Sequence, residues 1–306
     1  MDTTFFTRGR VVAVLALITC LLWGSAFPGV KSGYRLFAVQ PDDVATQLLF
    51  AGYRFSLAGI LVLLFAALAG GQKIFALKPS QWRRLALLGL AMTTIQYVFF
   101  YIGLAHTSGV KGSIVNSTST FFSVILAHFL YPSDRLRPNT IFGCALGFAG
   151  VVAVNWGGSL DGGFTFMGEG FLVISCFCLA AAGIYGKSLS QSINPMLMTG
   201  WQLSIGGLVL IALGLVLGGR LSGFTLASGT LLAYLALLSS TAFVLYSQLL
   251  KFNPVSRITI FNFSIPLFGA VLSAVFLGER LWEWKYFLAL ILVCSGVWLV
   301  TARRGV

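Results

Sequence analysis

The sequence predicts an all-α integral membrane protein, with ten transmembrane helices arranged as two inverted five-helix repeats around a central cavity. Composition is the first reason: 58% of the 306 residues are apolar and only 9% are charged. Soluble domains carry about 25% charged residues, so too few are present here to cover a water-facing surface. Recurring apolar stretches and motifs shared by the two halves are the other two reasons.

Ten apolar stretches are candidate spans, since a helix crosses the hydrocarbon core in about 20 residues. They are residues 11–31, 44–68, 84–105, 111–131, 139–157, 168–190, 195–218, 230–250, 254–277 and 282–302. Glycine and charged residues separate the stretches, for example at 70–73 and 218–220. The stretches lack the alternation of barrel strands, so we expect helices, which pair every backbone group internally.

The basic residues predict the orientation of the chain. With the N-terminus in the cytoplasm, most of the Lys and Arg residues between spans lie on the cytoplasmic side, among them Arg83, Arg84, Arg303 and Arg304. This distribution follows the positive-inside rule and predicts that both termini are cytoplasmic. It also accounts for the net charge of +12, so we expect no nucleic-acid partner.

The two halves share motifs in the same order, which predicts one repeat over residues 1–158 and a second over residues 159–306. The matching pairs include Ile18-Thr19-Cys20 with Ile174-Ser175-Cys176, Tyr53-Arg54 with Trp201-Gln202, Gly59 with Gly207, and Tyr101 with Tyr246. Because each repeat has an odd number of helices, the second must enter the membrane from the opposite side. Inverted repeats of this kind let a transporter expose one site to each side in turn.

Several motifs carry a family resemblance over nearly the whole chain. They are Trp23-Gly24-Ser25-Ala26-Phe27-Pro28, Tyr53-Arg54-Phe55-Ser56-Leu57-Ala58, the stretch from Pro266 to Phe276, and Ser295-Gly296-Val297. With these motifs the chain resembles the drug/metabolite transporter superfamily, specifically its ten-helix EamA type, and is similar to amino-acid exporters of the YddG kind. The resemblance implies a bundle with a central cavity, cytoplasmic termini and export of metabolites. The first repeat departs from the pattern, with Phe121 where the second has Pro266.

Polar and aromatic residues within the spans are candidates for substrate binding. In lipid, polar side chains turn toward other helices or toward water, so two inverted pairs of polar helices would line one cavity. The candidates are Trp23, Gln96, Tyr97, Tyr101, Asn116, Ser119, Tyr185, Trp201, Tyr246 and Asn262. For each residue the alternative is an interhelical hydrogen bond without substrate contact.

Three further residues are candidates for a gating or structural role: Pro28, Arg54 and Pro266. A charged residue inside a span is costly and should face protein or water. Arg54 could therefore contact a carboxylate substrate or a gate, or it could bond to neighbouring helices as a structural arginine. Each proline removes a backbone donor and could act as a hinge or as a fixed kink.

We therefore expect an exporter of small metabolites, most of all amino acids, that works by alternating access in a bacterial inner membrane. The alternative is a drug or toxic-compound exporter of the same fold. An enzyme is not expected, because the spans contain no paired carboxylates and no metal motif such as H-E-x-x-H. No metal or other cofactor is predicted. The expected partners are a small-molecule solute and the lipid bilayer, with a monomer as the expected state.

Overall fold

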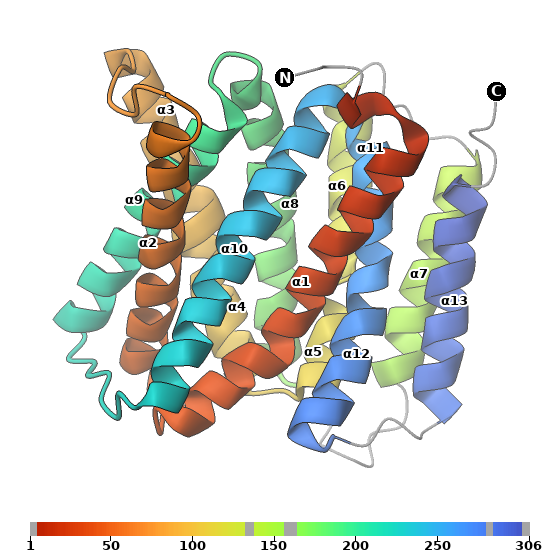
Figure 1. Cartoon of the computed structure of the whole chain (residues 1–306). Coiled ribbons are helices and arrows are strands. Elements are labelled where there is room, and N and C mark those ends of the chain that lie inside the picture. Colours follow the sequence, from red (N-terminus) through yellow and green to blue (C-terminus); the bar gives the residue numbers. More distant parts are fainter. Residues whose placement is uncertain (1–4, 132–137, 156–163, 280–283, 302–306) are drawn as a thin grey trace.

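The computed structural model describes residues 5–131, 138–155, 164–279 and 284–301, and within these ranges the chain is helical without strands (Figure 1). The α-helices are α1 Gly9–Leu36, α2 Val44–Leu68, α3 Pro79–Gly89, α4 Gln96–Ala105, α5 Gly109–Val115, α6 Thr118–Leu130, α7 Pro138–Asn155, α8 Phe171–Ser190, α9 Pro195–Val216, α10 Leu226–Phe252, α11 Val255–Thr259, α12 Ser264–Leu277 and α13 Trp284–Thr301. A short 3-10 turn, Phe5–Thr7, precedes α1.

Several of these helices join end to end, so that the chain crosses the bundle as ten rods. A π-helical turn, Leu90–Ile95, connects α3 to α4, and another, Phe166–Gly170, leads into α8. A 3-10 turn, Ile260–Phe263, connects α11 to α12, and α5 is followed closely by α6. Eight of the rods are long and apolar enough to span a membrane, and α7 and α13 complete the ten-helix fold.

The packing of the rods follows the inverted repeat. The two second helices, α2 and α9, pack together at one end of the bundle, and the two fifth helices, α7 and α13, pack together at the other (Figure 1). Between them, α1 packs against α10 and α12, and its counterpart α8 packs against α4 and α6. Helix α1 begins and α13 ends at the same face, which we call the terminal face (Figure 1); the other is called the opposite face.

Equivalent residues of the two repeats make equivalent contacts. Cys20 on α1 donates to the carbonyl oxygen of Phe261 at 3.1 Å, and its counterpart Cys176 on α8 lies 3.5 Å from the carbonyl oxygen of Asn116. These contacts link the first helix of each repeat to the interrupted fourth helix of the other. The predicted boundary between residues 158 and 159 lies outside the described residues.

Helices α2 and α9 approach closely because glycine stands at matching positions. A Cβ atom at Gly59 would lie 2.5 Å from the backbone nitrogen of Ser204, and one at Gly207 would lie 2.5 Å from that of Ser56. Both distances are far below van der Waals contact, so only glycine permits this crossing. Small residues at such crossings are typical of membrane helices, where close backbone packing drives association.

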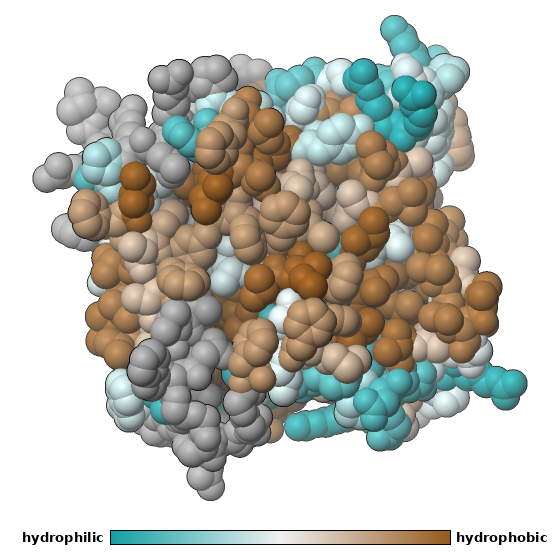
Figure 2. Space-filling model, turned by 180° about the vertical axis from the view of Figure 1, so that it is seen from behind, coloured by the Kyte–Doolittle hydropathy of each residue, from teal (hydrophilic) through white to brown (hydrophobic). Residues whose placement is uncertain are grey.

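The outer surface is suited to lipid. Figure 2 shows a broad apolar band across the molecule, with hydrophilic residues gathered at its two edges. Large apolar side chains such as Phe65, Phe129 and Val275 are exposed on this surface. In water such a surface would be strongly unfavourable, whereas in hydrocarbon it costs nothing. The chain is therefore a multi-pass membrane protein.

Candidate solute-binding cavity

A cavity of about 40 Å³ lies at the junction of the two repeats. Its lining residues are Trp23, Ala26, Phe27, Arg54, Gln96, Tyr97, Phe100, Asn116, Ser119, Leu179, Phe243, Asn262 and Ile265. A second cavity, of about 20 Å³, shares Trp23, Ser119, Leu179 and Asn262 with the first. It extends past Tyr246 to Val255, at the start of α11, and so toward the terminal face.

Interruptions in the helices place amide side chains at this cavity. Gln96 directly follows the π-helical turn of the third rod, Asn116 directly follows the end of α5, and Asn262 lies in the 3-10 turn of the ninth rod. Irregular backbone at membrane depth is typical of transporter sites, where it lines a cavity instead of facing lipid. Pro266 has no N–H to donate to the carbonyl group of Asn262, which favours the 3-10 turn there.

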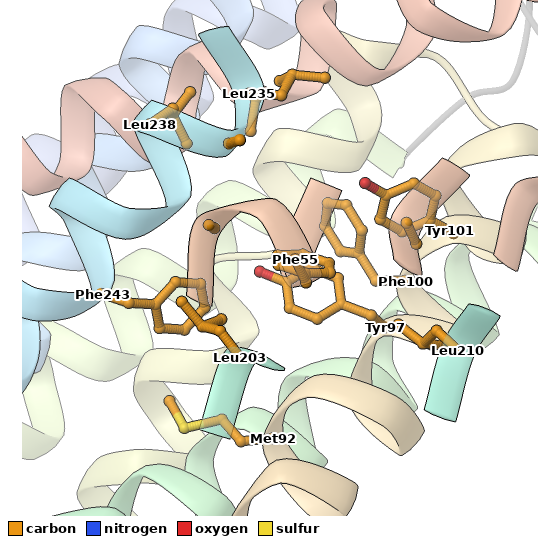
Figure 3. Close-up of a cluster of buried hydrophobic side chains, with 14 of the residues drawn as sticks. Phe55, Met92, Tyr97, Phe100, Tyr101, Leu203, Leu210, Leu235, Leu238 and Phe243 are labelled. Carbon is orange, nitrogen blue, oxygen red and sulfur yellow. The ribbon is translucent and has the colours of Figure 1, made fainter. Parts of the chain in front are cut away.

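Aromatic rings form much of the cavity wall. The rings of Trp23 and Tyr246 meet edge to face with centroids 4.8 Å apart. Figure 3 shows Tyr97 among Phe55, Phe100 and Phe243, and the Phe55 and Tyr97 centroids are 4.1 Å apart. Phe100 lies about one helical turn beyond Gln96 along α4 and lines the same cavity.

Arg54 is the charged residue of the cavity wall, and its side chain is only 1% exposed. Its Nε donates to Ser239 Oγ at 2.8 Å, and its Nη1 donates to Tyr101 Oη at 3.1 Å. The guanidinium carbon also lies 4.9 Å from the centroid of the Phe55 ring. All of these partners are electrically neutral.

Three buried polar atoms of the cavity wall have no hydrogen-bond partner among the described residues: Trp23 Nε1, Gln96 Oε1 and Ser119 Oγ. Other polar atoms nearby are paired. Gln96 Nε2 donates to Ser175 Oγ at 2.7 Å, and Asn262 donates to Tyr246 Oη at 3.3 Å. Buried polar groups in proteins are nearly always hydrogen-bonded, so the unpaired set indicates a place for water or a polar solute.

The opposite face is closed by carboxylates of the second repeat that hold the start of α5. Lys111 Nζ lies 2.9 Å from Glu169 Oε1, and Thr107 Oγ1 donates to the same oxygen at 2.7 Å. The side chain of Glu279 accepts from the backbone nitrogens of Gly109 at 3.0 Å and Val110 at 2.8 Å. These contacts fix the fourth rod of the first repeat to the sixth and ninth rods of the second.

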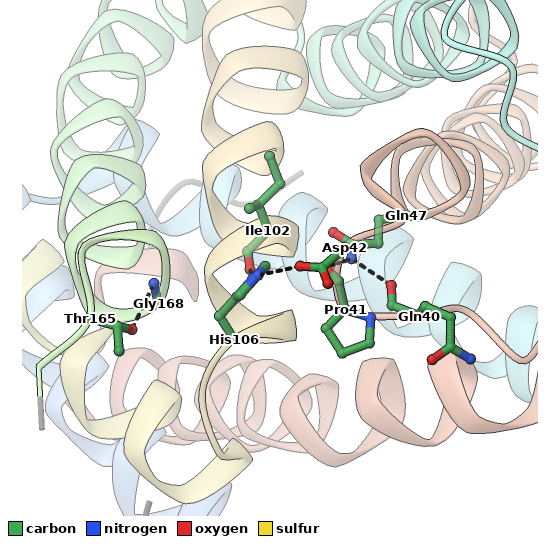
Figure 4. Close-up of polar contacts among 8 residues, drawn as sticks. All are labelled: Gln40, Pro41, Asp42, Gln47, Ile102, His106, Thr165 and Gly168. Atoms are coloured by element: carbon green, nitrogen blue, oxygen red, sulfur yellow. Dashed lines mark hydrogen bonds and ion pairs between the residues drawn. The ribbon is translucent and has the colours of Figure 1, made fainter. Parts of the chain in front are cut away.

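The segment between α1 and α2 adds to this closure. Gln47 Nε2 donates to the carbonyl oxygens of Gln40 at 3.1 Å and Pro41 at 2.7 Å, and His106 Nε2 lies 3.4 Å from Asp42 Oδ1 (Figure 4). Tyr34 also donates to the Tyr101 carbonyl oxygen at 2.9 Å. The first connecting segment is therefore tied to the end of α4.

Most of the predicted binding residues come together at the cavities. Six line the larger cavity: Trp23, Gln96, Tyr97, Asn116, Ser119 and Asn262. Tyr246 lines the smaller one, and Tyr101 is fully buried as the hydrogen-bond acceptor of Arg54. Their contact with a substrate stays a prediction.

The other predicted residues lie elsewhere. Trp201 Nε1 donates to the carbonyl oxygen of Ile74 at 2.9 Å, and Tyr185 Oη donates to that of Arg84 at 3.5 Å, so both rings face the segments around α3 instead of the two cavities. Pro28 lies inside a continuous α1, and Pro266 lies in the first turn of α12. Neither proline lines the cavities described above.

The cavity wall also contains residues that the sequence did not single out. These are Ala26, Phe27, Phe100, Leu179, Phe243 and Ile265. They are apolar residues in apolar spans, so the residue type does not indicate whether a side chain faces the cavity, another helix or lipid. The match of Tyr101 with Tyr246 does place Phe243 near the cavity, because it lies about one turn before Tyr246 on the same helix.

Comparison with known proteins identifies relatives along the whole chain. An uncharacterized transporter of Archaeoglobus fulgidus is 26% identical over 299 residues, covering 95% of this chain and 97% of that protein. The uncharacterized inner membrane transporter YedA of Escherichia coli is 26% identical over 288 residues, covering 93% of this chain and 88% of its own length. A solved crystal structure superposes with a TM-score of 0.75 at 16% identity and covers 96% of this chain and 97% of its own, which shows the shared fold.

The family match covers both repeats separately. Residues 10–156 and 166–302 each match the EamA-like transporter family. The first matched segment covers the five rods from α1 to α7, and the second covers the five rods from α8 to α13. The chain therefore belongs to the EamA-like transporter family.

Proposed function

We propose that this transporter exports small polar metabolites, with amino acids as the leading class, by alternating access through the central cavity. The observation that carries the proposal is the set of unpaired polar atoms on Trp23, Gln96 and Ser119, which face one cavity between the repeats. A polar solute with donors and acceptors would satisfy these atoms, whereas an apolar solute would leave them buried and unpaired.

The mixture of groups around the cavity supports a solute with both polar and apolar parts. Amide groups of Asn116 and Asn262 lie near the rings of Trp23, Tyr97 and Phe243 in the same wall. Pockets for small metabolites combine an apolar lining with a few polar groups that fix orientation. An amino acid with a neutral side chain presents both kinds of surface.

The closed opposite face supports alternating access. The Lys111–Glu169 ion pair and the Glu279 contacts must break before that face opens, while the smaller cavity extends toward the terminal face. A cavity of about 40 Å³ holds about three water molecules, so a solute requires the helices to move apart. We place the terminal face in the cytoplasm, so that loading occurs from inside and release outside.

Transport by purified protein in liposomes tests this proposal. Vesicles are preloaded with radiolabelled leucine, phenylalanine or threonine, with and without a pH gradient. We expect efflux above that of protein-free vesicles and little effect of the gradient, because the described cavity wall contains no carboxylate to carry a proton. Gln96→Leu should lower the flux, and Gln191→Leu, at an exposed position, should not. No flux of any amino acid would exclude this substrate class.

Export of a drug or toxic compound is the second candidate, and the aromatic wall favours it. The same vesicles can be loaded with a cationic dye such as ethidium. A cationic drug site needs a buried acid as its counter-ion, and the described wall instead contains the cation Arg54. We therefore expect no dye efflux. Dye efflux without amino-acid efflux would favour the drug exporter.

A further inference from the structure

The charge of Arg54 has no counter-ion among the residues that the structure describes. Its two hydrogen-bond acceptors, Ser239 and Tyr101, and the Phe55 ring are all neutral. A guanidinium group carries more N–H groups than these two bonds use. Since Arg54 also lines the cavity, its remaining N–H groups are available to a bound solute.

A purely structural role does not explain this arrangement. The bonds to Ser239 on α10 and Tyr101 on α4 tie three rods together, but both acceptors are neutral and neither requires a positively charged donor. A buried cation costs several kcal/mol unless an anion pairs with it. Pairing of the cation with an anionic solute during the transport cycle would offset this cost.

The unpaired atoms near Arg54 complement an anion that carries further polar groups. Trp23 Nε1 is a donor, Gln96 Oε1 is an acceptor, and Ser119 Oγ can be either. No carboxylate of the described wall could pair with an ammonium group. The wall therefore offers a full positive charge to an anionic solute. A cationic solute would meet only the dipoles of amide and hydroxyl oxygens and the aromatic rings.

We propose that the cavity recognises its solute through a carboxylate group that pairs with Arg54, and that an ammonium group on the solute is dispensable. This inference rests on the proposed transport function and narrows its substrate class to small organic acids, with amino acids as one kind. Guanidinium and carboxylate form paired hydrogen bonds of matching geometry. Amines and amides without a carboxylate are excluded, because they would leave the Arg54 charge unpaired.

Three ligands that share one carbon skeleton and differ in their polar groups test the proposal on the wild-type protein. They are leucine, the 2-oxo acid with the same carbon skeleton, and leucinamide, each added to detergent-purified protein in chloride-free buffer. Binding is measured by isothermal titration calorimetry. We expect leucine and the oxo acid to bind, and leucinamide to bind at least about tenfold more weakly, as for a lost charge-assisted hydrogen bond. Equal binding of leucinamide and leucine, or binding of neither acid at millimolar concentration, would overturn the proposal.

Substitutions at Arg54 then test whether this residue supplies the positive charge that binds the carboxylate. Arg54→Met should remove binding of both acids, and Arg54→Lys should retain part of it, because lysine keeps the charge without the planar fork. Arg83→Met, at an exposed position on α3, is the control for a lost positive charge elsewhere. If Arg54→Met does not fold, the comparison of Arg54→Lys with wild type on the three ligands decides. Unchanged acid affinity in Arg54→Lys, with leucinamide bound equally well, would contradict the proposal.

The outcomes separate this inference from the proposed amino-acid export. Binding of the oxo acid without amino-acid flux in liposomes would contradict amino-acid export and support carboxylate recognition. Amino-acid flux with equal binding of leucinamide would support export and contradict the role of Arg54.

Discussion

The buried ion pair on the opposite face offers a quantitative test of how the bundle is closed. The side chains of Lys111 and Glu169 are 12% and 3% exposed, and their charged atoms lie 2.9 Å apart. Removing one partner of a buried ion pair leaves the other charge buried and unpaired, which costs about 3–5 kcal/mol. We therefore expect Lys111→Met to lower the free energy of unfolding by about 3 kcal/mol, near the low end because Lys111 is partly exposed.

A double-mutant cycle isolates the contribution of the pair. Glu169→Gln keeps an oxygen that can accept from Thr107, and the double variant leaves neither charge unpaired. We expect the double variant to be more stable than Lys111→Met alone, with a coupling energy of about 2 kcal/mol, measured by denaturant unfolding in one detergent. Asp42→Asn is the control: its contact with His106 on the same face is 3.4 Å long, its side chain is 96% exposed, and we expect no measurable change. A coupling energy below about 0.5 kcal/mol would refute the reasoning.

Three more predictions follow from the packing. Gly207→Ala puts a Cβ atom 2.5 Å from the Ser56 backbone nitrogen and should lower the free energy of unfolding by about 1–3 kcal/mol. The control Gly229→Ala, whose Cβ atom would have no neighbour within 4 Å, should leave it unchanged. Equal effects of the two substitutions would contradict the close crossing of α2 and α9. Tyr101→Phe removes an acceptor of Arg54 and should cost about 1–3 kcal/mol in unfolding free energy; an unchanged value would show that this hydrogen bond contributes nothing. Reporter fusions at either terminus should report the same side of the membrane, the cytoplasmic one, and opposite sides would contradict the arrangement of the rods.

The spans could be predicted because contact with lipid imposes one composition over a known length. The predicted second span, residues 44–68, coincides with α2, Val44–Leu68. The amide residues of the cavity could be predicted for a related reason, since a polar side chain in a span is excluded from lipid. Gln96 and Asn262 are such cases, with exposures of 2% and 5%. In both cases a single property of the residue decides its environment.

The rest of the site depends on contacts that a residue type does not reveal. Phe100 lines the cavity and Phe129 faces outward, yet both are phenylalanine in an apolar span, and the chain has 27 phenylalanines. Trp201 has an aromatic ring and an N–H donor, as expected of a cavity residue. Its indole N–H instead donates to the carbonyl group of Ile74 in a connecting segment. Glu169, at the end of a span in the sequence, is buried in contact with Lys111 and Thr107 of the first repeat.

The scaffold follows the inverted repeat, whereas the charges break it. Arg54 is matched in the second repeat by Gln202, which donates to Thr93 Oγ1 at 3.3 Å. Lys111 is matched by Ser256, at the offset that relates Tyr101 to Tyr246. Arg54 and Lys111, the cations of the cavity wall and of the ion pair at the opposite face, therefore each occur in one repeat only.

This asymmetry has an energetic consequence for the transport cycle. Two identical inverted repeats would give inward-open and outward-open states of equal free energy, since each state is the other with the repeats exchanged. The unmatched Lys111–Glu169 pair stabilises closure of the opposite face, so we expect the resting protein to favour access from the terminal face. A solute shifts this preference only by binding the other state more tightly. Since Arg54 holds the one unpaired charge of the described cavity wall, the solute's carboxylate is the group best placed to supply that difference.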